Sequence, residues 1–210
     1  MLCIAIALLC IKRKNMTLRQ SLMKAFYPVI MLKGKVFSST KNIQQNGNKV
    51  IAPVSFYSLH ATANDGSDVN FESFKGKKVL IVNTASDCGY TGQYGELETL
   101  YQQHKDSLVV IGFPANDFKE QEKADDQAIA TFCKLNYGVS FLLMKKTVVV
   151  KGSLQNNVFA WLSDSTKNGW CNQQPTWNFN KYLVNETGIL THFFDKDISP
   201  LDNSVLKALQ

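Results

Sequence analysis

The chain has 210 residues, the size of one domain with room for an appendage. Hydrophobic residues make up 45% and charged residues 19% of it, a composition that excludes a disordered, collagen-like or polytopic membrane protein. Five cysteines at irregular spacing argue against a disulfide-stapled secreted scaffold and against paired zinc ligands, so a reducing compartment is expected.

The net charge of +6 is divided unevenly along the chain. Residues 1–50 hold nine of the 23 lysines and arginines and no acidic residue, which leaves 14 basic and all 17 acidic residues for the rest. The main body is therefore mildly acidic, and only the N-terminal arm suits an anionic partner. This division argues against a nucleic-acid-binding domain.

The N-terminal arm, residues 1–50, begins with an apolar run at residues 2–11, about half the length that spans a bilayer. A basic cluster follows this run, whereas in a signal peptide the basic residues come first. Residues 16–33 place Leu18, Leu22 and Phe26 at fourfold spacing beside basic residues, a pattern of a helix on a membrane surface, until Pro28 interrupts it. Translation starting at Met16 is the alternative.

Residues 34–48 are polar and predict a linker, so a folded domain is expected over residues 51–210. Its first part predicts an N-terminal β-hairpin, from a β-rich run at 54–59, a turn at 64–66 and a short run at 69–71. Nearly continuous apolar runs at 79–84 and 108–114 predict central strands that are buried on both faces.

Helical patterns lie between and after these runs. Tyr94, Leu97 and Leu100 fall on one helical face between the two central strands, which predicts a parallel pair with a right-handed crossover. A second helix is expected to begin near Asp125 and to close at Gly138.

The C-terminal third predicts strands at 147–150, 182–184 and 189–194, with the last two forming a hairpin, and a terminal helix from residue 200. Together the elements predict an α/β fold: a central mixed sheet with helices on both faces.

Cys88 lies just beyond the first central strand and just before a helix, in the segment NTASDCGYT of residues 83–91. Open α/β sheets bind their ligands at this edge. Backbone N–H groups and the helix dipole favour a thiolate there, so the sequence predicts a lowered thiol pKa and a nucleophilic sulfur. A small buried hydrophobic residue is the alternative role of such a cysteine.

Four segments resemble the successive motifs of glutathione peroxidases: NTASDCGYTGQYGELETLY at 83–101, GFPANDFKEQE at 112–122, IATFCKLNYGVSF at 129–141 and WNFNKYLV at 177–184. The resemblance extends over residues 54–209. It implies a thioredoxin-like fold and the reduction of hydroperoxides, a role in the response to oxidative stress.

The resemblance also implies the site. Cys88 would be the peroxidatic cysteine, in place of the selenocysteine of some relatives, with Gln121, Trp177 and Asn178 completing a catalytic tetrad. Amide and indole N–H groups suit this chemistry, because they stabilise the thiolate and the departing oxyanion. Without the resemblance, Trp177 would be expected to pack in the core. Gln121 and Asn178 would be expected to cap backbone groups of a loop.

Cys133 resembles the resolving cysteine of the thioredoxin-dependent relatives, which condenses with the oxidised Cys88. Such relatives commonly have another cysteine, and Ala115 occupies its position in this chain. Helical spacing places Cys133 on an apolar face, so simple packing is its alternative role, and Cys171 competes as a more exposed thiol. Leu142 stands where relatives usually have proline. This departure affects the expected shape of the local loop and not the chemistry.

Thioredoxin or glutathione is therefore the expected reductant, with no cofactor and no metal, because the three histidines are isolated. The short connection at 151–157 lacks the extra loop of tetrameric relatives, which implies a monomer. A redox sensor that passes oxidation to a partner protein is the alternative function. We expect a cytoplasmic protein, with the inner membrane face as a candidate location through residues 1–33, and export or anchoring through the apolar run as the alternative.

Overall fold

The computed structural model describes residues 16–37 and 43–210. The apolar run and basic cluster discussed for residues 2–14 lie outside the described residues. Within the described ranges, no helix combines the length and the apolar character that crossing a bilayer requires.

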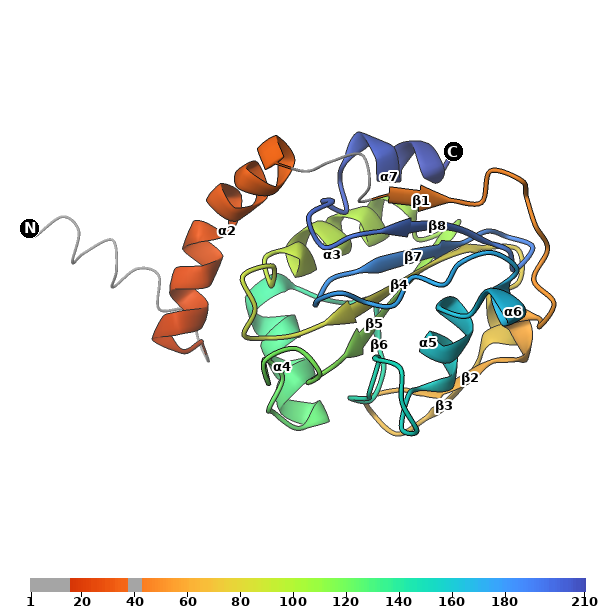
Figure 1. The fold of residues 1–210 in the computed structure, drawn as a ribbon. Helices are drawn as coiled ribbons and strands as arrows, with labels where there is room; N and C mark the ends of the chain where they lie inside the picture. Colours follow the sequence, from red (N-terminus) through yellow and green to blue (C-terminus); the bar gives the residue numbers. More distant parts are fainter. Residues whose placement is uncertain (1–15, 38–42) are drawn as a thin grey trace, which may run out of the picture.

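A six-stranded mixed sheet forms the centre of the domain, as predicted (Figure 1). Its strands lie in the order β1 (Ile43–Gln45), β8 (Leu190–Phe194), β7 (Lys181–Val184), β4 (Lys78–Thr84), β5 (Leu108–Pro114) and β6 (Leu142–Leu143). The contacts of β5 with β4 and β6 are parallel, and the other pairs are antiparallel. Thr84 and Pro114 are register partners, so the loops that follow β4 and β5 leave the sheet at the same edge.

Alternate side chains of the sheet enter two separate cores. One core packs under α3 (Gln93–His104), α4 (Asp126–Tyr137) and α7 (Asn203–Ala208). The other packs under α5 (Asn157–Leu162), with α6 (Ser165–Asn168) following it along the chain. Both faces of the sheet are thus covered by helices, which explains the continuous apolar runs of β4 and β5 (Figure 1).

The helix α4 begins and ends where the sequence predicted. The Asp125 carboxylate accepts a hydrogen bond from the Ala128 N–H at 2.8 Å, which caps the first turn. Gly138 ends the helix in the left-handed region, at φ 70°, where a residue without Cβ is favoured.

The N-terminal hairpin is present as a separate two-stranded sheet, β2 (His60–Thr62) with β3 (Asp68–Asn70). The strand predicted at 54–59 is wrong: this run forms the 3-10 helix η2 (Phe56–Ser58), because the Ser55 hydroxyl caps it. A second 3-10 helix, η3 (Phe71–Phe74), follows β3 and packs the buried ring of Phe71 against Phe56 of η2.

The strand predicted at 147–150 is also wrong. The N–H of residue 147 donates to the Pro114 carbonyl, and the N–H of Val149 donates to the Asp117 carboxylate at 2.9 Å, so these donors do not form a ladder. The edge strand is β6 instead, in which Leu142 pairs with Ile111. Leu142 is the residue that stands where a proline was expected from the resemblance.

The polar stretch predicted as a linker, 34–48, contains regular structure. Helix α2 (Leu18–Phe37) continues through Pro28, where an interruption was expected, and into this stretch. The strand β1 pairs with β8 at the sheet edge, because a backbone ladder needs no apolar side chains. The boundary at residue 51 stays a prediction. Figure 1 shows α2 beside α3 and α4.

Candidate functional site

The loop that carries Cys88 connects β4 to α3 and is held by its own hydrogen bonds. The Cys88 N–H donates to the Thr91 hydroxyl at 3.0 Å, and that oxygen lies 2.7 Å from the Cys88 carbonyl oxygen. The Asp87 N–H donates to the Gln121 carbonyl at 3.1 Å. The first two motifs of the resemblance are therefore joined directly at the sheet edge.

The sulfur of Cys88 is buried, with 1% of the residue exposed. It accepts a hydrogen bond from the Tyr90 N–H at 3.5 Å. Burial raises the pKa of the Cys88 thiol, and hydrogen bonds from the Tyr90 N–H and the side chains of Trp177 and Asn178 lower it only in part. The lowered pKa expected from the sequence is wrong, because desolvation outweighs these donors and α3 begins only at Gln93.

The four residues of the expected tetrad come together from three loops. The side-chain donors of Trp177 and Asn178 are near enough to the Cys88 sulfur to lower its pKa. The Asn178 Nδ2 donates to the Gln121 Oε1 at 2.9 Å, so Gln121 reaches the sulfur through Asn178. Gln121 and Asn178 are buried, and Trp177 is half-buried against the ring of Phe118. This arrangement supplies a set of N–H donors around one sulfur atom.

Left-handed backbone occurs next to two of these residues. Lys119 and Glu120 have φ values of 52° and 51° immediately before Gln121, and Phe179 has φ 68° immediately after Asn178. Such conformations are costly for residues with a Cβ and persist where the surrounding contacts enforce them. The backbone is thus bent sharply to aim both amide side chains.

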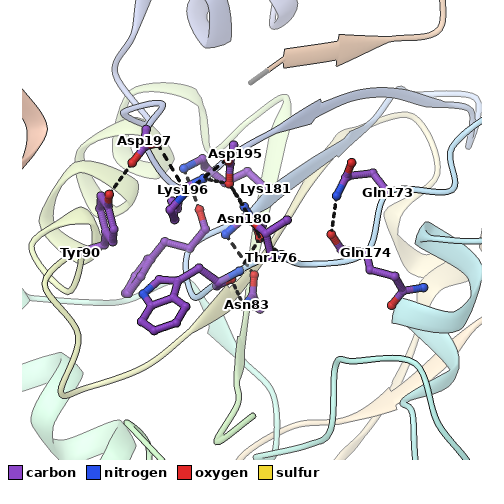
Figure 2. Close-up of polar contacts among 12 residues, drawn as sticks. Asn83, Tyr90, Gln173, Gln174, Thr176, Asn180, Lys181, Asp195, Lys196 and Asp197 are labelled. Atoms are coloured by element: carbon purple, nitrogen blue, oxygen red, sulfur yellow. Dashed lines mark hydrogen bonds and ion pairs between the residues drawn. The ribbon is translucent and has the colours of Figure 1, made fainter. Parts of the chain in front are cut away.

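Asn83, which the sequence analysis did not select, holds the loop that carries Trp177 and Asn178. Its Nδ2 donates to the Trp177 carbonyl at 2.9 Å, and its Oδ1 accepts the Asn180 N–H at 3.0 Å. Asn180 in turn accepts the N–H of Thr176 at 2.7 Å and donates to Asp195 at 2.6 Å (Figure 2). The sequence signal that could have identified Asn83 is that it is the single amide side chain in the apolar run VLIVNT.

Glu122, the neighbour of Gln121, is the second residue that the sequence analysis missed. It is buried, and one of its carboxylate oxygens accepts a hydrogen bond from the Ser86 hydroxyl at 2.9 Å. Burial raises the pKa of Glu122 to about 7, although the Ser86 hydrogen bond acts against this shift. A carboxylate in this state can hold or release a proton near neutral pH.

Lys181 is a second buried charge behind the site and the third residue that the sequence analysis missed. Its Nζ donates to the Gln93 Oε1 and to the Phe179 carbonyl, each at 2.8 Å. Burial lowers the pKa of Lys181 to about 7. The ammonium group therefore links the start of α3 to the residue that follows Asn178.

The two candidate resolving cysteines lie in different cores. Cys133 lies on α4 in the same core cluster as Cys88 and is fully buried, which raises its pKa to about 12. Cys171 lies in the core cluster of the opposite sheet face. The expectation that Cys171 is the more exposed thiol is wrong, because only 1% of it is exposed.

Comparisons with known proteins agree with this arrangement. The family model described as Glutathione peroxidase matches residues 56–163. The chain is 41% identical to "Glutathione peroxidase-like peroxiredoxin 2" of Saccharomyces cerevisiae, over 74% of this chain and 97% of that protein. It is 39% identical to "Glutathione peroxidase homolog BsaA" of Staphylococcus epidermidis, over 70% and 92%. The crystal structure of T. cruzi GPX1 superposes with a TM-score of 0.55 at 28% identity, covering 74% of this chain and 96% of that one.

Proposed function

We propose that this chain, a non-selenium peroxidase that belongs to the glutathione peroxidase family and has its thioredoxin-like fold, reduces hydroperoxides through the sulfur of Cys88. The supporting observation is the group of N–H donors, from Tyr90, Trp177 and Asn178, around one buried sulfur.

The first step is attack of the Cys88 thiolate on the terminal oxygen of the hydroperoxide. An S–O bond forms as the O–O bond breaks, which oxidises the sulfur to a sulfenic acid. The second oxygen leaves as an anion and takes up a proton, giving water or an alcohol. The same N–H donors that stabilise the thiolate are placed to stabilise this oxyanion, and Gln121 orients Asn178 for the task.

The second step forms a disulfide with Cys133. Its thiol attacks the sulfenic sulfur, the S–S bond forms, and the hydroxyl leaves as water with the thiol's proton. A dithiol such as thioredoxin, or two molecules of glutathione, then reduces the disulfide. Cys133 lies within α4, well after the helix begins, and we propose that the helix unwinds locally so that the two sulfurs meet.

Single serine variants of the two cysteines test this assignment. Cys133→Ser should abolish thioredoxin-supported steady-state turnover and keep one round of peroxide reduction. Cys171→Ser is the matched control, since its thiol is equally buried but lies in the opposite core, and it should keep full turnover. Unchanged turnover in Cys133→Ser would reject the resolving role. A stable mixed disulfide with one partner protein, without peroxide turnover, would favour the sensor function instead.

We also propose a monomer in the cytoplasm as the working form. All three cysteines that the structure describes are free thiols, the state that a reducing compartment maintains. Sedimentation velocity of the reduced full chain tests the monomer, and fractionation of the source cells tests the compartment.

A further inference from the structure

Helix α2 carries a stripe of apolar side chains on its solvent side. Five large residues are exposed at spacings of three or four: Leu18, Leu22, Phe26, Val29 and Leu32. The exposed fractions are 72% for Leu18, 58% for Phe26 and 62% for Leu32. This spacing puts them along one side of a helix, so they form one continuous surface, here termed the α2 stripe.

The opposite side of α2 is fixed to the loop of Cys88. Arg19 forms an ion pair with Asp87 at 3.1 Å, and the Gln20 Nε2 donates to the Ser86 carbonyl at 3.3 Å. Further along, the Tyr27 ring packs so closely on Gly92 that a side chain there would collide with it. These contacts set the rotation of the helix, and the α2 stripe therefore stays on the outside.

Charge identifies what the α2 stripe can bind. The sequence of α2 has four basic residues and no acidic one: Arg19, Lys24, Lys33 and Lys35. An apolar side on a helix whose sequence has only positive charges matches a bilayer surface with anionic headgroups, which takes up the apolar side chains and attracts the charges. A second copy of the chain fits less well, because two such helices would bring like charges together.

We propose that the α2 stripe binds the surface of a bilayer that contains anionic lipids, with the helix lying in the plane of the membrane. The inner side of α2 keeps its contacts with the loop of residues 86–92, so binding brings the candidate site close to the lipid. The binding surface shares no residue with the sulfur chemistry, and the two proposals can fail separately.

Co-sedimentation of the full chain with vesicles tests the proposal. The chain should bind vesicles of phosphatidylcholine mixed with phosphatidylglycerol, bind phosphatidylcholine alone more weakly, and lose affinity as salt rises. The double variant Leu22→Ser, Phe26→Ser should bind at least about tenfold more weakly, since two apolar side chains no longer enter the lipid. Leu154→Ser, at a site that is 78% exposed and far along the chain, is the control and should bind like the parent.

Three outcomes would overturn the proposal: no binding of the parent chain to anionic vesicles, equal binding by the double variant, or loss of binding in both variants. Sedimentation equilibrium without lipid adds a fourth. If the parent chain is a dimer and the double variant a monomer, the stripe binds a second copy. Thermal unfolding of each variant, followed by circular dichroism, confirms that the exposed substitutions leave the fold intact.

Discussion

At Cys88, burial and hydrogen bonding act on the thiol in opposite directions. Burial is the larger effect and raises the pKa, so only a fraction of the thiol is ionised at neutral pH. The side-chain donors then matter for both the amount of thiolate and the barrier to peroxide cleavage. The rate of the first step should therefore rise with pH through the neutral range.

Asn178→Ala removes one of these donors and also leaves Gln121 without its hydrogen bond. We expect the first step to slow by about a hundredfold, as for loss of one preorganised donor, and its pH profile to move to higher pH. Stopped-flow measurement of a single turnover at several pH values gives both quantities. Asn172→Ala, at an exposed asparagine, is the control. A slower rate with an unmoved pH profile would show that Asn178 acts on the geometry and not on the thiolate.

Glu122 gives a prediction for stability. Its pKa is raised to about 7 in the folded protein, from an ordinary value near 4.5 in the unfolded chain. Between these values the folded state keeps a proton that the unfolded state has lost, so this contribution to stability is present below about pH 4.5 and is lost as the pH rises through about 7.

Glu122→Gln removes the titration and keeps an acceptor for the Ser86 hydroxyl. The free energy of unfolding of this variant should therefore fall less than that of the parent between about pH 4.5 and about pH 8. Urea denaturation at both pH values measures the difference. Parallel pH dependences in the two proteins would mean that Glu122 ionises normally in the fold.

The sequence identified site residues where a motif carries them and missed those that depend on distant contacts. Cys88, Gln121, Trp177 and Asn178 were selected from the family motifs, and the structure brings them together. Lys181 stands in a strand of mixed polarity and gives no sign that its charge is fully buried. Its partner comes from a helix 88 positions earlier, a pairing that no local pattern encodes.

At the scale of elements, α2 connects the two parts that would move if the proposed disulfide forms. It binds the loop of Cys88 through Arg19, and it binds the end of α4 through Lys24. The Lys24 Nζ donates to the Asn136 carbonyl at 2.6 Å and lies 4.0 Å from the centre of the Tyr137 ring. Local unwinding of α4 has to break these contacts.

Lys24→Met removes both contacts and keeps the length of the side chain. We expect disulfide formation after one equivalent of peroxide to become about fivefold faster, since one hydrogen bond and one cation–π contact contribute on the order of 1 kcal/mol. Rapid quenching with an alkylating reagent measures the rate. Lys167→Met, whose ion pair with Asp164 lies on α6, is the control. An unchanged or slower rate in Lys24→Met would show that this end of α4 need not open.

Elements with a strong local pattern were predictable, and edge elements were not. The strands β4 and β5 are continuous apolar runs, and α4 has a capping residue at each end. The strand β1 consists of Ile43 and two glutamines and pairs with β8 through its backbone, so its sequence resembles a linker. The apolar run at 147–150 packs as a loop because its N–H groups are bound elsewhere.

At the scale of the whole molecule, the sheet divides the three cysteines of the described ranges between its two faces. Cys88 and Cys133 share the core under α3 and α4, and Cys171 lies in the core under α5. The loops after β4 and β5 meet at one edge because those strands are parallel neighbours in register. The position of the candidate site follows from this topology, and the α2 stripe lies on a helix that precedes the sheet in the chain.

The identity of the cysteine that hydrogen peroxide oxidises tests the central claim most directly. The Cys133→Ser variant is treated with one equivalent of hydrogen peroxide, and its sulfenic acid is trapped with dimedone and located by peptide mass spectrometry. The account predicts the label on Cys88 alone, with no label on Cys171, and no peroxide consumption once Cys88 is also replaced by serine. Label on another cysteine, or peroxide reduction that survives Cys88→Ser, would contradict it.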